Sequence, residues 1–199
     1  MMNNHYFIEN ESLKSQTRII NYEFGGKSFK FKTHDGVFSK EHVDHATDIL
    51  LNTIPPLEEN STLLDMGCGY GSIGIVLAKS YNLTLTQCDI NPATVELTRY
   101  NSKLNGVTSN IFVSDCFENV SERFDTIVIN PPIHAGKAVT YEMYEKSLKH
   151  LTLNGKLYVV TFKKHGAEST ITKLRNVFNN CETIYKKKGI YVLECIMMQ

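Results

Sequence analysis

The sequence lacks any long hydrophobic run, since none of its apolar stretches approaches the roughly 20 residues that span a bilayer. Residues 1–10 also lack the basic and then apolar layout of a secretory signal. Cysteine is sparse, and the five cysteines form no CxxC motif or His-rich grouping. We therefore expect a cytoplasmic protein with reduced thiols, no membrane segment and no metal site. The cysteines are Cys68, Cys88, Cys116, Cys181 and Cys195.

Net charge is also absent, because 21 Lys+Arg balance 21 Asp+Glu. The charges are nevertheless uneven: residues 137–199 carry eleven Lys+Arg against five Asp+Glu, whereas residues 1–136 carry ten against sixteen. A basic C-terminal third is suited to a polyanion such as a nucleic acid. Chance segregation of charge on a solvated surface explains the same pattern, so charge alone does not decide between the two.

The chain has the length and composition of one globular domain, with 199 residues of which 42% are hydrophobic. Two alternating runs, 19–24 and 28–33, flank Gly25-Gly26 and predict a β-hairpin. A short helix is expected at 43–51. From Ser61 onward, apolar strands alternate with amphipathic helices, which is typical of a mostly parallel sheet covered on both faces.

The pattern predicts an α/β fold with a doubly wound, Rossmann-like, seven-stranded, mostly parallel sheet, one antiparallel edge strand and a small N-terminal hairpin. In the helix that Asn91-Pro92 starts, Leu97, Tyr100 and Leu104 mark the apolar face. We expect residues 57–199 to form one compact unit after an extension at 1–56. The predicted strands are 62–66, 83–88, 110–113, 125–129, 156–161, 182–186 and 190–197, and the later helices are 71–80, 92–104, 139–151 and 167–178.

A glycine-rich loop, Asp65-Met66-Gly67-Cys68-Gly69-Tyr70-Gly71, joins the first sheet strand to the following helix. Glycines at alternate positions let the backbone turn sharply and approach a nucleotide-like ligand at the helix N-terminus. The loop lacks Gly-Lys-Ser/Thr, which excludes a phosphate-binding P-loop. Asp65 would repel a pyrophosphate and favour a cationic ligand. A purely structural glycine turn would explain the loop by itself.

Two further acids follow the next strands. Asp89 lies 24 residues after Asp65, where an acid reaches ribose hydroxyls, and Asp115 ends the third strand in the same way. A single strand-end Asp is usually a cap or turn residue. Because the carboxyl ends of parallel strands share one edge, however, these three acids form a row there, and with the glycine loop they indicate a ligand site.

Asn130-Pro131-Pro132-Ile133 follows the fourth strand. Proline donates no backbone hydrogen bond and fixes φ, so the chain leaves the sheet in a stiff, extended conformation. A carboxamide and neighbouring carbonyls are thereby held at the carboxyl end of a strand, where open α/β sheets bind ligands. Taken alone, the stretch is also explained as a simple strand exit.

Together, the glycine loop, Asp89, Asp115 and Asn130-Pro131-Pro132 resemble the class I S-adenosylmethionine-dependent methyltransferases. The resemblance implies that the loop passes the methionine part of the cofactor, that Asp89 holds the ribose and that Asp115 holds the adenine amino group. The Asn-Pro-Pro tetrapeptide is the form found in enzymes that methylate exocyclic or amide nitrogens. The implied cofactor-binding residues are Asp65, Gly67, Cys68, Gly69, Gly71, Asp89, Ile90, Asp115, Cys116 and Asn130.

A narrower resemblance is carried by the stretches 36–40, 64–71, 130–137 and 163–167, which are similar to the small-subunit ribosomal RNA guanine-N2 methyltransferase C family. It covers nearly the whole chain and implies a catalytic domain at 57–199 that acts on ribosomal RNA within the small subunit. Longer members carry a further degenerate domain in front, and this chain resembles the short, single-domain form. Two departures are His134, where an Arg is common, and His45-Ala46, which replaces an aromatic-Gly pair.

The predicted catalytic residues are Asn130, Pro131, Pro132 and Ile133. The Asn130 side-chain oxygen and the Pro131 carbonyl are suited to accept both N–H bonds of an exocyclic amine and to orient it towards the methyl group. Ile133 stands where adenine-N6 and glutamine methyltransferases usually have an aromatic residue, which favours guanine. The expected substrate-binding residues are Phe38, Lys40, His134, Lys137, Lys163 and Lys164.

Several alternatives remain open from the sequence. His134 can stack on or donate to a base, or it is an ordinary loop histidine. Each lysine by itself is more often a solvated surface residue. The enzyme alternatives are methylation of adenine N6 or of a protein glutamine. A noncatalytic, cofactor-binding RNA interaction module is a further alternative, although such a module would be free to lose the acid row and Asn130.

Overall fold

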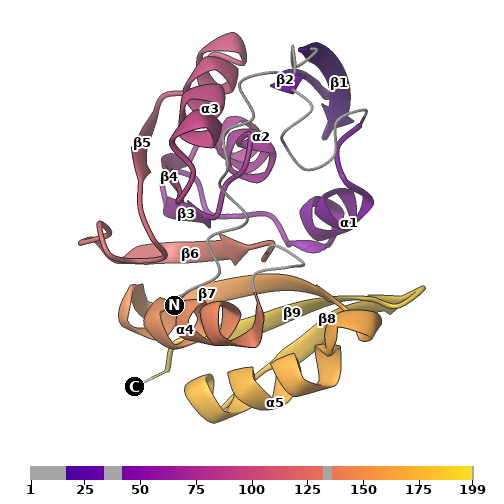
Figure 1. Cartoon of the computed structure of the whole chain (residues 1–199), viewed down its shortest axis with the longest axis vertical. Helices are drawn as coiled ribbons and strands as arrows, with labels where there is room; N and C mark the ends of the chain where they lie inside the picture. Colours follow the sequence, from indigo (N-terminus) through magenta and orange to yellow (C-terminus); the bar gives the residue numbers. More distant parts are fainter. Residues whose placement is uncertain (1–16, 34–41, 132–135, 199) are drawn as a thin grey trace, which may run out of the picture.

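The structure is a computed structural model that describes residues 17–33, 42–131 and 136–198. Within these ranges, seven strands form one sheet in the order β5-β4-β3-β6-β7-β9-β8, and two more form a hairpin (Figure 1). The hairpin strands are β1 (Arg18–Phe24) and β2 (Lys27–Thr33). The sheet strands are β3 (Thr62–Met66), β4 (Thr84–Asp89), β5 (Ser109–Val113), β6 (Phe124–Ile129), β7 (Leu151–Phe162), β8 (Glu182–Lys187) and β9 (Ile190–Ile196).

The predicted fold class is confirmed. The pairings from β5 across to β7 are parallel, and the antiparallel pairings lie at one edge, where β9 runs between β7 and the edge strand β8. From β3 the chain moves outward to β4 and β5, and then returns to β6 on the other side of β3. This reversal creates a topological switch point between β3 and β6, and open α/β sheets bind ligands at the carboxyl side of such a point.

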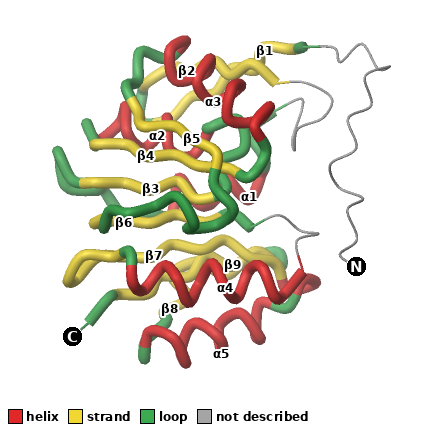
Figure 2. Tube along the Cα trace, turned by 60° about the vertical axis from the view of Figure 1, so that its left-hand side comes forward, coloured by secondary structure: helices red, strands yellow, loops and turns green. Residues whose placement is uncertain are grey.

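Helices cover both faces of the sheet. One face carries α1 (His45–Thr53), α2 (Ser72–Tyr81) and α3 (Pro92–Leu104), and the other carries α4 (Gly136–Lys149) and α5 (Ala167–Phe178) (Figures 1 and 2). The strand period of two divides the core accordingly: Leu63 belongs to the cluster under α1 and α2, whereas Leu64 and Met66 belong to the cluster under α4 and α5. The sheet is therefore buried from both sides.

The predicted hairpin is confirmed, and it packs on α2 and α3. Phe29 and Phe31 are fully buried within the same hydrophobic cluster as α1 and α2. The side-chain amide of Asn101 pairs with the backbone N–H and C=O of Lys32 at 2.7 and 3.0 Å, and Asn105 pairs in the same way with Lys30 at 3.0 and 2.8 Å. Two amides one helical turn apart thus satisfy the free edge of β2.

Because of this contact, the buried face of α3 differs from the predicted apolar face. The helix forms as expected, and the Asn91 side chain caps it by accepting from Ala93 N at 2.9 Å. Tyr100 and Leu104, however, are 49% and 41% exposed. The buried face instead includes polar residues, because the hairpin backbone provides hydrogen-bond partners that helical periodicity cannot reveal. The buried polar residues of this face are Thr94, Thr98, Asn101, Ser102 and Asn105.

The boundary between α4 and β7 also differs from the prediction. The sequence predicts a helix over residues 139–151 and a strand from residue 156, but α4 ends at Lys149 and β7 already begins at Leu151. Asn154 has a left-handed φ of 64°, and the β6–β7 register shifts between Phe124 and Thr126. Asn-Gly therefore forms an irregularity inside a long strand, a role that has the same local signature as a helix stop.

None of the helices in the described ranges has both the length and the apolar character needed to cross a bilayer. Among the same residues, no group of three or more His, Cys, Asp or Glu side chains is arranged to hold a metal ion. All five cysteines are buried free thiols.

Candidate active site

The carboxyl edge of the parallel strands gathers the residues that the sequence singles out. The sheet order β5-β4-β3-β6 places Asp115, Asp89, the glycine loop and Asn130 next to one another in that order. These segments surround the switch point between β3 and β6. The predicted row of strand-end residues is therefore present, and it extends from the acids to the Asn130 carboxamide.

The glycine loop folds over the end of β4, where the N–H groups of Gly67 and Cys68 both donate to Cys88 O at 2.9 and 3.0 Å. Gly69 and Gly71 have left-handed φ angles of 57° and 88°. A Cβ on Gly69 would meet no atom within 4 Å, whereas a Cβ on Gly71 would lie 2.8 Å from Thr98 Cγ2. Gly69 therefore faces open space suited to a ligand, and Gly71 is required for packing.

Asp65 lies beneath this loop, not on its surface. Its side chain is 1% exposed, and its Oδ2 accepts hydrogen bonds from Gly74 N at 2.8 Å and from Gln87 Nε2 at 3.2 Å. Burial raises the pKa of Asp65 to about 6, although both hydrogen bonds act in the opposite direction. The expectation that this carboxylate meets a cationic ligand directly is not supported by the geometry, because the carboxylate holds the loop in place.

Asp89 is better placed for a ligand. Its Oδ2 accepts from Gly69 N and its Oδ1 accepts from Asn91 N, both at 3.0 Å. Burial raises the pKa of Asp89, against these backbone hydrogen bonds. A carboxylate has about four acceptor positions, so each oxygen retains capacity for a hydroxyl group. The adjoining Ile90 is 45% exposed and offers an apolar wall.

Asp115 and Cys116 occupy the turn after β5. Asp115 is exposed, whereas Cys116 is buried and has a left-handed φ of 47°, which is uncommon outside glycine. The Ser114 hydroxyl donates to Cys116 O at 2.8 Å and stabilises the turn. Cys68 differs from these residues, because its thiol is buried against Thr98, its backbone N–H donates to Cys88 O in β4 and its C=O accepts from Gly71 N within the loop. Its role is therefore to shape the loop.

Asn130 follows β6 and is half-buried. Its Nδ2 donates to Thr47 Oγ1 at 3.0 Å, which connects it to helix α1. Pro131 lines a cavity of about 140 Å³ on the α4 and α5 side of the sheet, together with Lys137, Tyr141 and His165 among others. The remaining members of the predicted catalytic tetrapeptide, Pro132 and Ile133, lie outside the described residues, as do Phe38, Lys40 and His134.

Two of the predicted phosphate-binding lysines lie on the single-turn 3₁₀ helix η1 (Lys163–His165) directly after β7. Lys163 and Lys164 are exposed. Lys137, from the start of α4, reaches the same place, since its Cε lies 3.8 Å from the position that a Cβ on Gly166 would occupy. The structure therefore brings the three described lysines together beside the Asn130–Pro131 exit.

Three residues that shape this edge were not predicted, namely Gln87, Thr98 and Thr47. Gln87 is fully buried and contacts Asp65, and the Thr98 hydroxyl donates to Gly69 O at 2.6 Å. The sequence signal that could have identified these residues is a polar residue inside an otherwise apolar strand or helix face. Such a residue must find a partner when it is buried, but the sequence does not indicate which one.

The residues at this edge fit S-adenosylmethionine, the cofactor that the sequence resemblance implies. The open face at Gly69 lets a ligand approach the backbone, and Asp89 has spare acceptors for ribose hydroxyls. Ile90 offers an apolar surface beside them. Asp115 lies exposed at the next strand end, where it can accept from an amino group.

The chain is similar over most of its length to known methyltransferases. The family model of the methyltransferase small domain matches residues 28–194. The chain is 40% identical over 197 residues to the Bacillus subtilis uncharacterized protein YbxB, covering 97% of this chain and 98% of that protein. It is 32% identical over 194 residues to ribosomal RNA small subunit methyltransferase C of Vibrio parahaemolyticus, covering 93% of this chain but 54% of that protein. The chain thus spans about half the length of that methyltransferase.

Solved structures show the same similarity. The T. thermophilus 16S rRNA N2 G1207 methyltransferase (RsmC), in complex with AdoMet and guanosine, superposes with a TM-score of 0.82 at 25% identity and covers 90% of this chain and 50% of that chain. A methyltransferase from Pyrococcus furiosus has a TM-score of 0.71 at 19% identity over 85% of this chain and 89% of that chain. The second likeness concerns the fold alone.

The buried carboxylate predicts a pH dependence of stability. The pKa of Asp65 is about 6 in the folded protein against an ordinary value of 3.8, so the unfolded chain loses this proton first as pH rises. The protonated Asp65 side chain therefore contributes fully to the free energy of unfolding below about pH 4. This contribution is lost as the pH rises through 6, which lowers the free energy of unfolding by about 3 kcal/mol. Asp65→Asn should remove it. Urea unfolding of both proteins between pH 4 and 7 measures the difference, and a difference that is independent of pH would contradict this.

The two glycine environments predict opposite phenotypes. Gly69→Ala should cost only about 1 kcal/mol of stability, since it meets no protein atom, but should weaken S-adenosylmethionine binding at least about tenfold because its methyl group projects into the open face. Gly71→Ala should lower stability by about 2–4 kcal/mol through the clash with Thr98. Calorimetric titration and thermal unfolding measure the two effects. Unchanged cofactor affinity in Gly69→Ala would exclude the proposed ligand face.

Proposed function

We propose that this chain, which belongs to the methyltransferase small domain family, methylates the exocyclic N2 amine of a guanine in small-subunit ribosomal RNA. S-adenosylmethionine is the cofactor. The RNA substrate is suggested by relatives named ribosomal RNA small subunit methyltransferase C and by the guanosine in the T. thermophilus complex. The observation that carries the proposal is the position of Asn130, whose amide nitrogen is bound to Thr47 at the carboxyl end of β6.

The proposed chemistry uses few groups of the chain. S-adenosylmethionine supplies, when bound, a methyl group activated by a sulfonium. Asn130 Oδ1 and the Pro131 carbonyl accept the two N–H bonds of the guanine amine, which directs its lone pair away from the ring. As the nitrogen–methyl bond forms and the sulfur–methyl bond breaks, the same two oxygens stabilise the positive charge that develops on the amine. The amine then loses a proton to solvent, so no strong general base is required.

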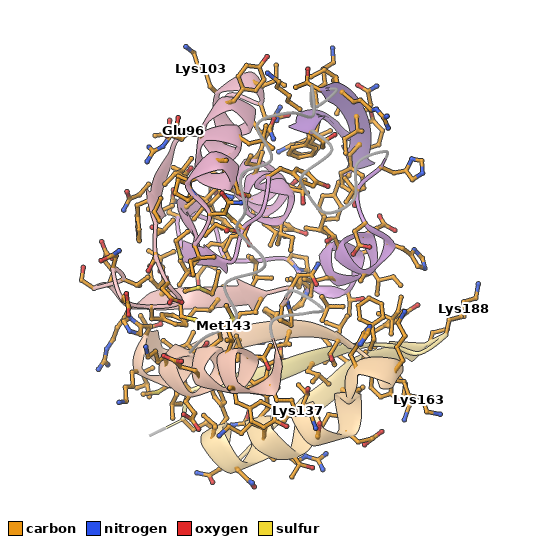
Figure 3. All side chains as sticks on the ribbon, viewed as in Figure 1. Glu96, Lys103, Lys137, Met143, Lys163 and Lys188 are labelled. Carbon is orange, nitrogen blue, oxygen red and sulfur yellow. The ribbon has the colours of Figure 1, made fainter. Side chains whose placement is uncertain are left out.

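A basic surface beside this exit supports RNA as the substrate. Lys163 N donates to Gly189 O at 2.8 Å, so the turn between β8 and β9 lies against η1. Lys186 and Lys187 at the end of β8 and Lys188 in the turn are all exposed, and they add to the three lysines around η1. Figure 3 shows Lys163 and Lys188 on the same side of the molecule. We therefore include the turn, together with Lys137, Lys163 and Lys164, in the surface that contacts RNA phosphates.

Asn130→Ala tests the role of the carboxamide. We expect methyl transfer to fall at least about 100-fold, because the amine loses one of its two acceptors, while the affinity for S-adenosylmethionine stays within about twofold. Transfer of labelled methyl groups to small subunits and to free RNA that lack the modification, followed by nucleoside mass spectrometry, measures the reaction and identifies the product. If the wild-type protein produces N6-methyladenosine, or labels only protein, the proposed guanine substrate is wrong. If Asn130→Ala turns over at the wild-type rate, the proposed role of Asn130 is refuted.

Replacing Lys187, at the end of β8, and Lys188, in the β8–β9 turn, tests the RNA surface. In Lys187→Gln/Lys188→Gln, the slope of log affinity against log salt should become shallower by about 0.7 to 0.9 for each lost phosphate contact. The matched control is Lys103→Gln/Lys149→Gln, which removes the same charge at the ends of α3 and α4, away from η1. Filter binding of small-subunit RNA across a salt series measures both slopes. Equal slopes for the two variants would show that the β8–β9 turn does not contact RNA phosphates.

A further inference from the structure

We infer that Thr47 is a positioning residue, whose hydroxyl binds the nitrogen end of the Asn130 amide and so holds the side chain with its oxygen turned away from α1. The inference rests on the proposed role of Asn130. It extends the site to helix α1, a segment that neither the glycine loop nor the acid row includes.

The contact itself is specific. Asn130 Nδ2 donates to Thr47 Oγ1 at 3.0 Å across 83 residues of sequence. Thr47 is 4% exposed, so water does not readily replace this partner. The bond holds the nitrogen end of the Asn130 side chain against α1, with the Thr47 hydroxyl as its acceptor. The oxygen then lies on the other side of the amide, where its lone pairs remain available.

The hydroxyl is held rigidly from its own side. Asp44 caps α1, and its Oδ2 accepts from Ala46 N and from Thr47 N, each at 3.1 Å. Leu50 and Leu51, one turn further along, are fully buried in the core cluster. The Thr47 backbone therefore has little freedom, and a β-branched side chain in a helix has few rotamers. The hydroxyl is thus a fixed reference point for the amide.

Without this partner, no side-chain hydrogen bond in the described part of the chain would hold the Asn130 amide in place. The terminal torsion of asparagine is broad and roughly two-fold, so the group can rotate and present its NH₂ in place of its oxygen. An NH₂ group pointed at an amine donor repels it instead of accepting from it. Thr47 therefore acts on the rate of transfer through the orientation of Asn130 and contacts neither cofactor nor substrate in this proposal.

The contact also bears on the proposed division of the chain at residue 56. Thr47 belongs to the N-terminal extension, yet within the described part of the chain its side chain hydrogen-bonds to Asn130, the predicted catalytic residue of the following unit. The helix packs against α2, β7 and β9, so the sheet supports it. The extension thereby completes the site in addition to covering the core.

Three variants of the full-length chain test the inference. Thr47→Val keeps the side-chain shape and removes the acceptor, so kcat should fall about 10- to 100-fold, while KM for RNA and the Kd for S-adenosylmethionine change less than about twofold. Thr47→Ser retains the hydroxyl and should restore kcat to within about threefold of wild type. In an Asn130→Ala background, Thr47→Val should cause no further loss, since the group that it orients is gone.

The outcomes separate this inference from the proposed function. If the wild-type protein forms no N2-methylguanosine, the proposed function fails and the inference, which depends on it, fails as well. If the wild type forms it and Thr47→Val retains the wild-type kcat, the proposed function stands and the positioning role is refuted. Thermal unfolding accompanies each assay. A Thr47→Ser protein that is folded but as slow as Thr47→Val would also refute the role, because the hydroxyl would then not be the cause.

Discussion

One carboxylate buried beneath the glycine loop determines the shape of the whole carboxyl edge. Asp65 accepts from Gly74 N at the start of α2 and from the amide of Gln87 in β4. The other end of that amide accepts from the hydroxyls of Ser102 and Ser109 at 3.4 and 3.3 Å. The network therefore ties β3, β4, β5, α2 and α3 together. A charge in this environment is costly unless it is hydrogen-bonded, and these donors offset part of the cost while aligning the strand ends.

A second polar contact supports the loop from the opposite side. Asn101, fully buried in α3, donates from its Nδ2 to Tyr70 O at 2.8 Å and also pairs with the backbone of Lys32 in the hairpin. Phe31 of the hairpin packs edge-on against the Tyr70 ring at 5.7 Å between centroids. One side chain thus connects the N-terminal hairpin to the cofactor loop, so the hairpin stabilises the site from a distance as well as covering the core.

The proposed reaction draws on both faces of the sheet. Asn130 is oriented from the α1 face by Thr47, whereas Pro131 borders the cavity on the α4 and α5 face, where Lys137 and His165 also lie. The basic surface continues from there to the β8–β9 turn through the contact between Lys163 and Gly189. In the proposed function, the acceptor for the amine therefore lies at the border between a cofactor edge rich in acids and a surface rich in lysines.

Local pattern was sufficient for the type and order of the elements, the fold class and the strand-end residues, because the periods of strands and helices and the chemistry of glycine and proline act within a few residues. The sequence by itself determined the loop at Asp65–Gly71, the acid Asp89 and the Asn130-Pro131 exit. Only the tertiary structure decided that Asp65 faces inward, that Tyr100 is exposed while Asn101 is buried, and that Thr47 binds Asn130. A buried polar group takes its role from a partner that is distant in sequence, and helical or strand periodicity carries no information about that partner.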